Sequence, residues 1–366
     1  MVNRLIVANL AARPVRTALS VTAVAVEMIL ILLVVGLTHG MLEESANRTV
    51  GVGAEIMVQP QSTSFIMGLS GTPMPVQIAD RIAAVPGVRA VAPVATQVSS
   101  EGGVTLIYGI DPDRFNAVSG GFRFLEGGPM QSQDEILVDD IHARARDLHP
   151  GQTVELLNNS FRLAGIVEHG KGARIFMNID KLQELIGAPG KASLFFVKVT
   201  EPRQIAPVLQ QLRELLPNYQ LRDMQEFLSL MTANNIPGLN NFITVMIALA
   251  VSIGLLVIFI TMYSTIVERT REIGILKSMG ASKGYIVGVV LRETAALTVL
   301  GIVAGIALTF LLRRLTLVVF PTLPILLTAG WMLRAALIAL GASLLGATYP
   351  AFRASKLDAI QAIAYE

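Results

Sequence analysis

The sequence predicts a membrane protein with four transmembrane α-helices and a large extracytoplasmic mixed α/β domain inserted between helices 1 and 2. Three observations lead to this fold class. Of the 366 residues, 52% are hydrophobic and only 15% are charged, and the mean hydropathy of +0.59 lies outside the range of soluble globular proteins. Four stretches are long and apolar enough to cross a bilayer. Between the first two, residues 40–238 have the composition of a folded α/β domain.

The four apolar stretches cover residues 17–38, 242–267, 294–312 and 335–352. A single charged residue, Glu27, interrupts the first of them, and the second has none. The first stretch is too long for the apolar core of a signal peptide, and no small-residue cleavage site follows it. We therefore expect it to be a retained transmembrane helix.

These helices define the predicted organisation of the chain. Residues 1–39 are the N-terminus and transmembrane helix 1, 40–238 the α/β domain, 239–267 transmembrane helix 2, 268–283 a charged segment, 284–313 transmembrane helix 3, 314–330 a short loop, 331–352 transmembrane helix 4 and 353–366 a tail. Within the α/β domain, residues 111–194 are a candidate inserted lobe.

Lysines and arginines in the short segments predict the orientation, because they collect on the cytoplasmic side of membrane proteins. Nine lie before helix 1, between helices 2 and 3 or after helix 4: Arg4, Arg13, Arg16, Arg269, Arg271, Lys277, Lys283, Arg353 and Lys356. Only Arg313, Arg314 and Arg334 lie near the loop between helices 3 and 4. We therefore expect both termini and residues 268–283 in the cytoplasm, and the α/β domain outside it.

Inside the α/β domain, local patterns predict individual elements. Short runs of β-branched residues predict strands at residues 54–58, 105–109, 154–157, 161–167 and 194–199. Apolar residues at three- and four-residue spacing predict helices at 76–84 and 203–216.

Several kinds of chemistry find no support in the sequence. The absence of cysteine excludes disulfides, zinc–thiolate sites and cysteine nucleophiles. A net charge of +2, without a basic block interleaved with aromatic residues, gives no reason to expect a nucleic-acid partner. We expect the four histidines at the surface, because they lack the spacing of metal ligands; they are His39, His142, His149 and His169.

The chain also lacks a phosphate-binding loop. Residues 187–193 come nearest to one, but Leu185 stands in place of the first glycine and Ala192 in place of the serine or threonine. We therefore expect no cofactor or metal bound by this chain and no catalytic residues, and any ATP must bind to another chain.

Two further features have both a functional and a structural interpretation. Glu27 lies near the middle of helix 1, where a carboxylate costs roughly 2.5–3.5 kcal/mol on insertion scales. It either lines a functional seam between helices or only hydrogen-bonds a neighbouring helix. Residues 61–76 are too apolar for an ordinary exposed loop, which makes Phe65, Met67 and Met74 candidates for contacting substrate or the membrane surface. The alternative is a loop packed onto its own domain.

Residues 268–283, Glu-Arg-Thr-Arg-Glu-Ile-Gly-Ile-Leu-Lys-Ser-Met-Gly-Ala-Ser-Lys, give the strongest functional pattern. On a helix, two carboxylates and three large apolar groups share one face, which we call the docking face: Glu268, Glu272, Ile275, Leu276 and Met279. Arg269, Ile273 and Lys277 lie elsewhere on the helix. The mixed docking face suits a socket on another protein, and the alternative is an interfacial helix without a partner.

The same segment is predicted to continue transmembrane helix 2 without a break. No proline or glycine pair interrupts residues 241–279, so we expect a rigid rod of helix across this range. Gly280 can adopt the left-handed conformation that ends the helix, and Ser282 can cap the start of the next one.

Three stretches resemble a known family. Residues 268–282 look like the signature of FtsX-like permeases, the MacB-type (type VII) membrane subunits of ABC transporters. Residues 349–363, Tyr-Pro-Ala-Phe-Arg-Ala-Ser-Lys-Leu-Asp-Ala-Ile-Gln-Ala-Ile, resemble the C-terminal motif of that family, and residues 9–20, Asn-Leu-Ala-Ala-Arg-Pro-Val-Arg-Thr-Ala-Leu-Ser, resemble the start of its helix 1. Ala359 stands where the family commonly has proline. Without a fused ATPase domain, the sequence resembles the stand-alone form of these permeases.

The resemblance implies a permease dimer, homo- or heteromeric, in the bacterial inner membrane that works with two copies of a separate ABC ATPase, which binds ATP and Mg²⁺. ATP-driven closure would be relayed to the α/β domain, which expels or extracts a lipophilic or amphiphilic substrate. Membrane lipids and a periplasmic adaptor are further candidate partners. The residues that it implies for coupling to the ATPase are Glu268, Arg271, Glu272, Ile275, Leu276, Met279 and Gly280. The alternative is a regulator of a periplasmic cell-wall hydrolase that moves no substrate.

Overall fold

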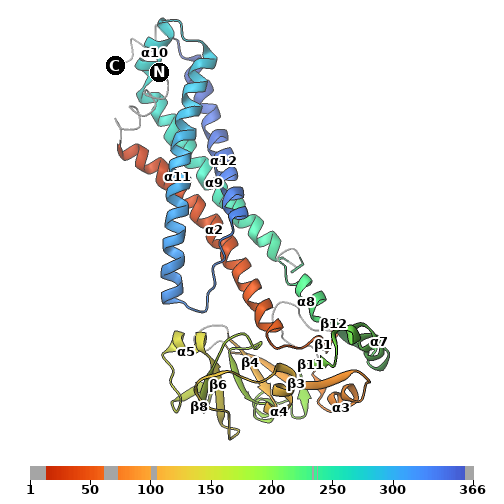
Figure 1. Cartoon of the computed structure of the whole chain (residues 1–366). Helices are drawn as coiled ribbons and strands as arrows, with labels where there is room; N and C mark the ends of the chain where they lie inside the picture. Colours follow the sequence, from red (N-terminus) through yellow and green to blue (C-terminus); the bar gives the residue numbers. More distant parts are fainter. Residues whose placement is uncertain (1–13, 62–72, 100–104, 233–234, 237, 359–366) are drawn as a thin grey trace. The chain divides into compact units, whose positions relative to one another are not determined.

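The computed structural model describes residues 14–61, 73–99, 105–232, 235–236 and 238–358 (Figure 1). It divides into two compact units. The helical unit comprises Met1–His39, Gly238–Thr316 and Ile325–Glu366, and the α/β unit comprises Gly40–Pro237 and Leu317–Pro324.

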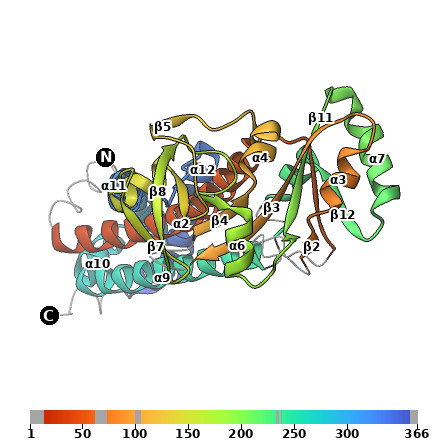
Figure 2. The same ribbon diagram turned by 90° about the horizontal axis from the view of Figure 1, so that it is seen from below.

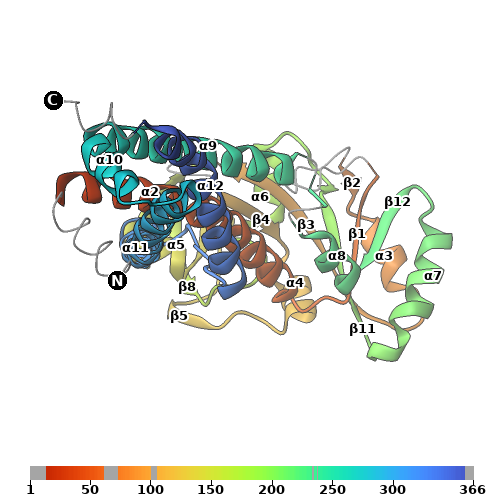
Figure 3. The ribbon, with the colours of Figure 1, turned by 90° about the horizontal axis from the view of Figure 1, so that it is seen from above.

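Within the described ranges, four helices are long and apolar enough to cross a membrane, and they contain the four predicted stretches: α2 (Pro14–Val50), α9 (Leu239–Glu268), α11 (Lys283–Val319) and α12 (Ala329–Lys356). α9 and α12 pack side by side (Figure 3). α11 approaches α2 closely at Gly305, where an added Cβ would lie 2.6 Å from the Cβ of Met28. Such small residues let membrane helices pack tightly. The helical part of the predicted fold class is confirmed.

Two of these helices extend beyond their predicted ends. α2 continues to Val50, past the predicted end of transmembrane helix 1 at residue 39, and Glu44 and Arg48 form an i,i+4 ion pair of 3.6 Å on its last turns. α11 begins at Lys283, because the hydroxyl of Ser282 accepts a hydrogen bond of 3.2 Å from the backbone N–H of Tyr285. The predicted cap at Ser282 is thus confirmed.

The expected uninterrupted helix over residues 241–279 is wrong at one position. α9 ends at Glu268 and a separate helix, α10 (Thr270–Ser278), follows after Arg269, whose backbone angles of −102° and 15° are not helical. The hydroxyl of Thr270 donates to the carbonyls of Ile266 (3.1 Å) and Val267 (2.8 Å). Such back-bonding can bend a helix, but Thr261 makes the same pair of bonds to Val257 and Ile258 inside the unbroken α9, so it does not by itself explain the break.

The α/β unit is built on a mixed sheet. Its described strands are β1 (Ile56–Pro60), β3 (Val88–Ser99), β4 (Thr105–Ile110), β5 (Phe124–Gly127), β6 (Glu135–Asp139), β7 (Thr153–Leu156), β8 (Asn159–Val167), β9 (Ile175–Asn178), β11 (Leu194–Val199) and β12 (Tyr219–Asp223). The order is β12-β1-β11-β3-β4-β9-β6-β8-β5, with β7 on β8. β4 pairs with β9 and β6 with β8 in parallel, and the other pairs are antiparallel. A small second sheet pairs β2 (Met74–Pro75) with β10 (Lys191–Ala192).

Short helices cover both faces of the sheet: α3 (Ile78–Ala83), α4 (Pro112–Ser119), α5 (Asp140–Arg146), α6 (Ile179–Leu185), the 3₁₀ turn η1 (Pro202–Gln204), α7 (Ile205–Leu215) and α8 (Met224–Leu230). Alternate residues of β1 show the two faces. Ile56 and Val58 pack with α3 and α7, whereas Met57 packs with α4 and α8. Figure 2 shows α3 and α7 at the β11–β12 end. The strands within the candidate lobe, residues 111–194, continue the same sheet through β9 and β4.

Two residues of the α/β unit contradict their sequence-based interpretation. His142, expected at the surface, is only 3% exposed. It lies on α5, and its main-chain N–H donates to the capping Asp139 at the end of β6. Met74, a candidate for substrate or membrane contact, is 1% exposed in the core beside α3 and α7 and therefore has no side-chain surface to offer. Phe65 and Met67 lie outside the described residues.

The buried histidine predicts a pH-dependent stability. Burial lowers the pKa of His142 to about 4, assisted by the nearby guanidinium groups of Arg146 and Arg174. Between that value and the ordinary pKa near 6.5, the unfolded chain binds a proton that the folded chain does not. Stability therefore falls as the pH drops through this window, by up to about 3 kcal/mol. Amide exchange of the α5 segment in the full chain, measured across this pH range, should show this loss.

The His142→Leu variant should lose this pH dependence, because leucine has a similar volume and no proton to take up. His149→Leu is the matched control, since the side chain of His149 is 62% exposed. A slope that persists unchanged in His142→Leu would assign the pH dependence to other groups.

Candidate functional site

α10 presents the docking face to solvent. Met279 is 70% exposed, Ile275 45% and the side chain of Glu272 61%, and Leu276 is half-buried. Arg271 is exposed as well. Exposed apolar groups beside a carboxylate are a composition that is compatible with a protein contact.

The opposite face of α10 is fastened to the rest of the helical unit. Ile273 is buried in a cluster with Ile266 of α9, Ile286 of α11 and Ala354 of α12. One turn further, the ammonium group of Lys277 donates to the carbonyl of Ser355 at 3.0 Å and to that of Leu357. These carbonyls end α12 without helical partners, so Lys277 caps that helix.

Arg269, at the break between α9 and α10, makes the connection to α11. Its guanidinium donates to both carboxylate oxygens of Glu293, at 3.0 and 3.2 Å, and to Glu272 at 3.0 Å. The side chains of Arg269 and Glu293 are only 15% and 9% exposed. A charged group on the docking face is thereby joined to a buried ion pair.

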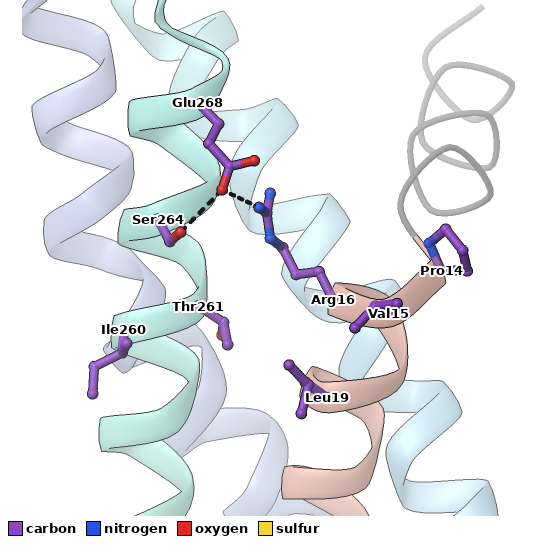
Figure 4. A pocket seen from close by; sticks show the side chains of 8 residues that line it. All are labelled: Pro14, Val15, Arg16, Leu19, Ile260, Thr261, Ser264 and Glu268. Carbon is purple, nitrogen blue, oxygen red and sulfur yellow. Dashed lines mark hydrogen bonds and ion pairs between the residues drawn. The ribbon is translucent and has the colours of Figure 1, made fainter.

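A third connection runs to α2. The guanidinium of Arg16 forms an ion pair with the carboxylate of Glu268 (Figure 4). It also lies 3.4 Å from the hydroxyl of Thr265. The hydroxyl of Ser264 donates to the same carboxylate at 3.2 Å. Figure 4 shows the pocket that the two helices enclose beside this pair; it is lined by Pro14, Val15, Arg16, Leu19, Ile260, Thr261, Ser264 and Glu268. Glu268, assigned to the docking face from the sequence, thus also holds α2.

The end of α10 matches its prediction. Gly280 has a φ of 91°, its N–H donates to the carbonyl of Lys277 at 3.0 Å, and the N–H of Ala281 donates to Leu276 at 3.0 Å. This pair of bonds is the Schellman motif, which needs a residue without a Cβ at the left-handed position. Gly280 therefore ends the helix as expected.

A second group of charges lies in the α/β unit, at the far end of α2. Arg174, whose side chain is 7% exposed, donates to Asp139 of β6 at 3.0 Å and also pairs with Glu44 of α2. Asp139 accepts a hydrogen bond from the N–H of His142 at 2.6 Å, which caps α5. Burial raises the pKa of Asp139, and the charge of Arg174 opposes that rise. Burial also raises the pKa of the neighbouring Tyr108 to about 12.

These connecting residues were not recognised in the sequence. Arg269, Ile273 and Lys277 recur every four residues opposite the docking face, and this spacing is the only sequence signal for an anchored face. Glu293, the partner of Arg269, and Arg16, the partner of Glu268, carried no local pattern that linked them to this segment.

The remaining sequence-predicted site residue is Glu27, which is 2% exposed on α2. Within the described part of the chain, no group of three or more histidine, aspartate or glutamate side chains is arranged to hold a metal ion.

Comparison with known proteins agrees with this architecture. The model of the MacB-like periplasmic core domain matches residues 17–215, and the model of the FtsX-like permease C-terminal domain matches residues 244–359. An uncharacterized ABC transporter permease of Bacillus subtilis, YvrN, is 22% identical over 296 residues, which are 71% of this chain and 70% of the relative.

Another uncharacterized ABC transporter permease, MJ1507 of Methanocaldococcus jannaschii, is 26% identical over 196 residues, which are 51% of this chain and 49% of the relative. The alignment thus spans about half the length of that relative. The crystal structure of the periplasmic region of MacB from Actinobacillus actinomycetemcomitans superposes with a TM-score of 0.38 and 15% identity, covering 48% of this chain and 92% of that chain. The first family model alone covers more than half of the sequence, so the chain belongs to the FtsX-like, MacB-type family of ABC transporter permeases.

Proposed function

We propose that this chain is the membrane subunit of an ABC transporter that passes the motion of a separate ATPase, docked on α10, to the α/β unit. The observation that carries the proposal is the two-sided character of α10. Glu272, Ile275 and Met279 of its docking face are exposed, whereas Arg269, Ile273 and Lys277 join its other face to α11 and α12. Glu268, at the end of α9, pairs with Arg16 of α2. Because of these contacts, a displacement of α10 must move the neighbouring helices with it.

Two helices are available to carry this motion. α9 precedes α10 directly, with the break at Arg269 between them. α2 begins beside the Arg16–Glu268 pair and is one helix of 37 residues, which at 1.5 Å per residue is about 55 Å long. Its far end carries Glu44, which is held by Arg174 in the α/β unit. The charge network at Arg174 is therefore the point at which α2 would act on the sheet.

In this proposal α10 lies on the cytoplasmic side of the inner membrane, where the partner ATPase binds ATP and Mg²⁺, and two permease copies form the transporter. A lipophilic or amphiphilic substrate fits the arrangement, because such a molecule collects at the outer face of the membrane and can reach the α/β unit without passing through the helical unit. The chain itself contributes movement and no catalytic group.

Met279→Asp tests the docking face. A carboxylate in an apolar contact is expected to lower the stimulation of ATP hydrolysis by the permease at least about tenfold, equivalent to about 1.4 kcal/mol of lost contact energy. The permease and its partner ABC ATPase would be reconstituted in lipid vesicles, and ATP hydrolysis and complex formation would be measured.

Ser278→Asp is the matched control for this test. Ser278 is also exposed, one residue earlier on α10 and about 100° around the helix, and both substitutions place the same charge near the same helix end. Equal losses in both variants would show a general effect on α10 and contradict the docking face. Failure of wild-type permease and ATPase to associate would overturn the proposed function itself.

A further inference from the structure

Glu27 is a buried carboxyl group without a counter-charge. The residue is 2% exposed, and neither of its carboxylate oxygens has a hydrogen-bond partner among the described residues. The head of the side chain lies directly against Gly254 of α9, so closely that a Cβ at that position would collide with the carboxyl group. In this packing Gly254 leaves the space that the carboxyl group of Glu27 occupies.

The surroundings of Glu27 are apolar. One turn before and after Gly254, α9 contributes Ala250 and Ile258, which are 3% and 0% exposed, and on α2 the adjacent Met28 is 0% exposed. Neither α9 over residues 239–267 nor α11 over residues 294–312 carries an acidic or basic side chain.

Other titratable groups lie at a distance along these helices. On α9 the nearest is Tyr263, nine residues from Gly254 and thus about 13 Å along the helix, and the next is Glu268. On α2, Arg16 and His39 are eleven and twelve residues from Glu27, or about 16–18 Å. α11 has Glu293 and Arg313 beyond the two ends of its apolar stretch. Neither carboxylate oxygen of Glu27 has a hydrogen-bond partner among these groups in the described chain.

Glu293 shows what a buried carboxylate requires in the same unit. Its side chain is 9% exposed, comparable to Glu27, but it is paired with the guanidinium of Arg269 at 3.0 Å. An ionised carboxylate is stable in such a site only with a cation or several donors, and an unpartnered one takes up a proton instead. Glu293 is thus an ion-paired carboxylate, whereas Glu27 is an unpartnered carboxyl group of similar burial.

We propose that Glu27 is a proton-binding site: it is the neutral acid while α2 is packed on Gly254, and it releases the proton to water when the seam between α2 and α9 opens. No co-reactant is needed, since the carboxylic acid gives carboxylate and a proton. The next buried polar group on the same face of α2 is Ser20, two turns earlier, which is 0% exposed and whose hydroxyl also has no partner. Arg16 follows one turn before it. Ser20 and Arg16 are thus the polar side chains that lie on this face of α2 toward its N-terminal end.

A protonated site of this kind links the seam to pH. Because the proton binds to the closed packing better than to the open one, acid favours the closed seam and alkali favours the open one. This property is independent of the docking face, and its test requires neither an ATPase nor a substrate.

Labelling of the full chain in lipid vesicles with the hydrophobic reagent dicyclohexylcarbodiimide tests the site, since this reagent modifies neutral carboxylic acids in apolar surroundings. Mass spectrometry should find Glu27 modified at least roughly tenfold more than Glu293 in the same sample, and the modification should fall as the pH is raised. Equal labelling of the two glutamates, or labelling of Glu27 that does not change with pH, would overturn the proposal.

Infrared spectroscopy detects the protonation state of Glu27 without a labelling reagent. The spectrum of the wild type minus that of Glu27→Gln should contain the carbonyl stretch of a neutral acid, which disappears as the pH is raised. Glutamine has the same shape and cannot ionise, so the variant is expected to fold. If the difference spectrum shows only the carboxylate at every pH, the site holds no proton and the proposal fails, whatever the labelling result.

Discussion

Replacing Arg269 by methionine is expected to lower the free energy of unfolding of the helical unit by about 3–5 kcal/mol. The reason is the state of Glu293, which is 9% exposed and whose two carboxylate oxygens both accept hydrogen bonds from this guanidinium. Without Arg269 a buried carboxylate has no partner. The loss should appear in thermal unfolding of the full chain in detergent, followed by the fluorescence of Trp331, the only tryptophan, which lies in the helical unit.

The double variant Arg269→Met/Glu293→Gln separates the unpaired charge from the lost side chain. It removes the buried charge, so most of the lost stability should return. The interaction energy from the double-mutant cycle should therefore be larger than about 1 kcal/mol. As a matched control, Arg271→Met removes an exposed arginine two residues away. If Arg269→Met lowers the free energy of unfolding no more than this control does, the Arg269–Glu293 pair does not stabilise the helical unit.

Much of the helical unit could be predicted because membrane helices are specified locally. An apolar stretch must satisfy its own backbone groups inside the bilayer, so residues 17–38, 242–267, 294–312 and 335–352 had only one available structure. The break at Arg269 was missed because no proline marks it and residues 241–279 keep the composition of one continuous helix.

The sheet was predicted only in part, for a different reason. β1, β4, β7, β8 and β11, and the helices α3 and α7, correspond to predicted runs. The longest strand, β3 (Val88–Ser99), was missed, because it contains Pro93, which argues against a central strand, and lies between β11 and β4 with most of its middle residues buried on both faces. A strand buried on both sides shows no alternation of polar and apolar residues.

For the candidate site, the sequence predicted the exposed face of α10 and not its attachments. Helical spacing alone assigned Ile275 and Met279 to one face, and both are exposed. The partners of the other face come from distant parts of the chain: Arg16 is 252 residues from Glu268, and Lys277 is 78 residues from Ser355. A single sequence gives the type of each side chain but not which distant partner it meets.

Replacing Arg174 by methionine is expected to cost the α/β unit about 3–5 kcal/mol of local stability and to free the end of α2. Arg174 neutralises Asp139, which is buried, and it is also the partner of Glu44. Amide exchange of the full chain in detergent should increase in β6, in α5, whose cap is Asp139, and in the last turns of α2. If α2 acts on the sheet through this network, the variant should also lose the response of the α/β unit to ATP while keeping its bound ATPase.

Arg162→Met provides a matched control, because Arg162 pairs with Glu135 across the adjacent β6 and β8, at 3.8 Å, with its side chain 69% exposed. An exposed pair contributes only about 0–1 kcal/mol.

The pH dependence of stability gives a second test of the role of Arg174. In Arg174→Met the pKa of Asp139 rises further, so the folded state binds a proton that the unfolded state, with a pKa near 3.9, has lost. The stability of the variant must then fall as the pH rises from about 3.9 to the raised pKa of Asp139, and acid should restore part of that stability. A loss of stability equal to that of Arg162→Met, or one that acid does not reduce, would mean that Asp139 does not depend on this arginine.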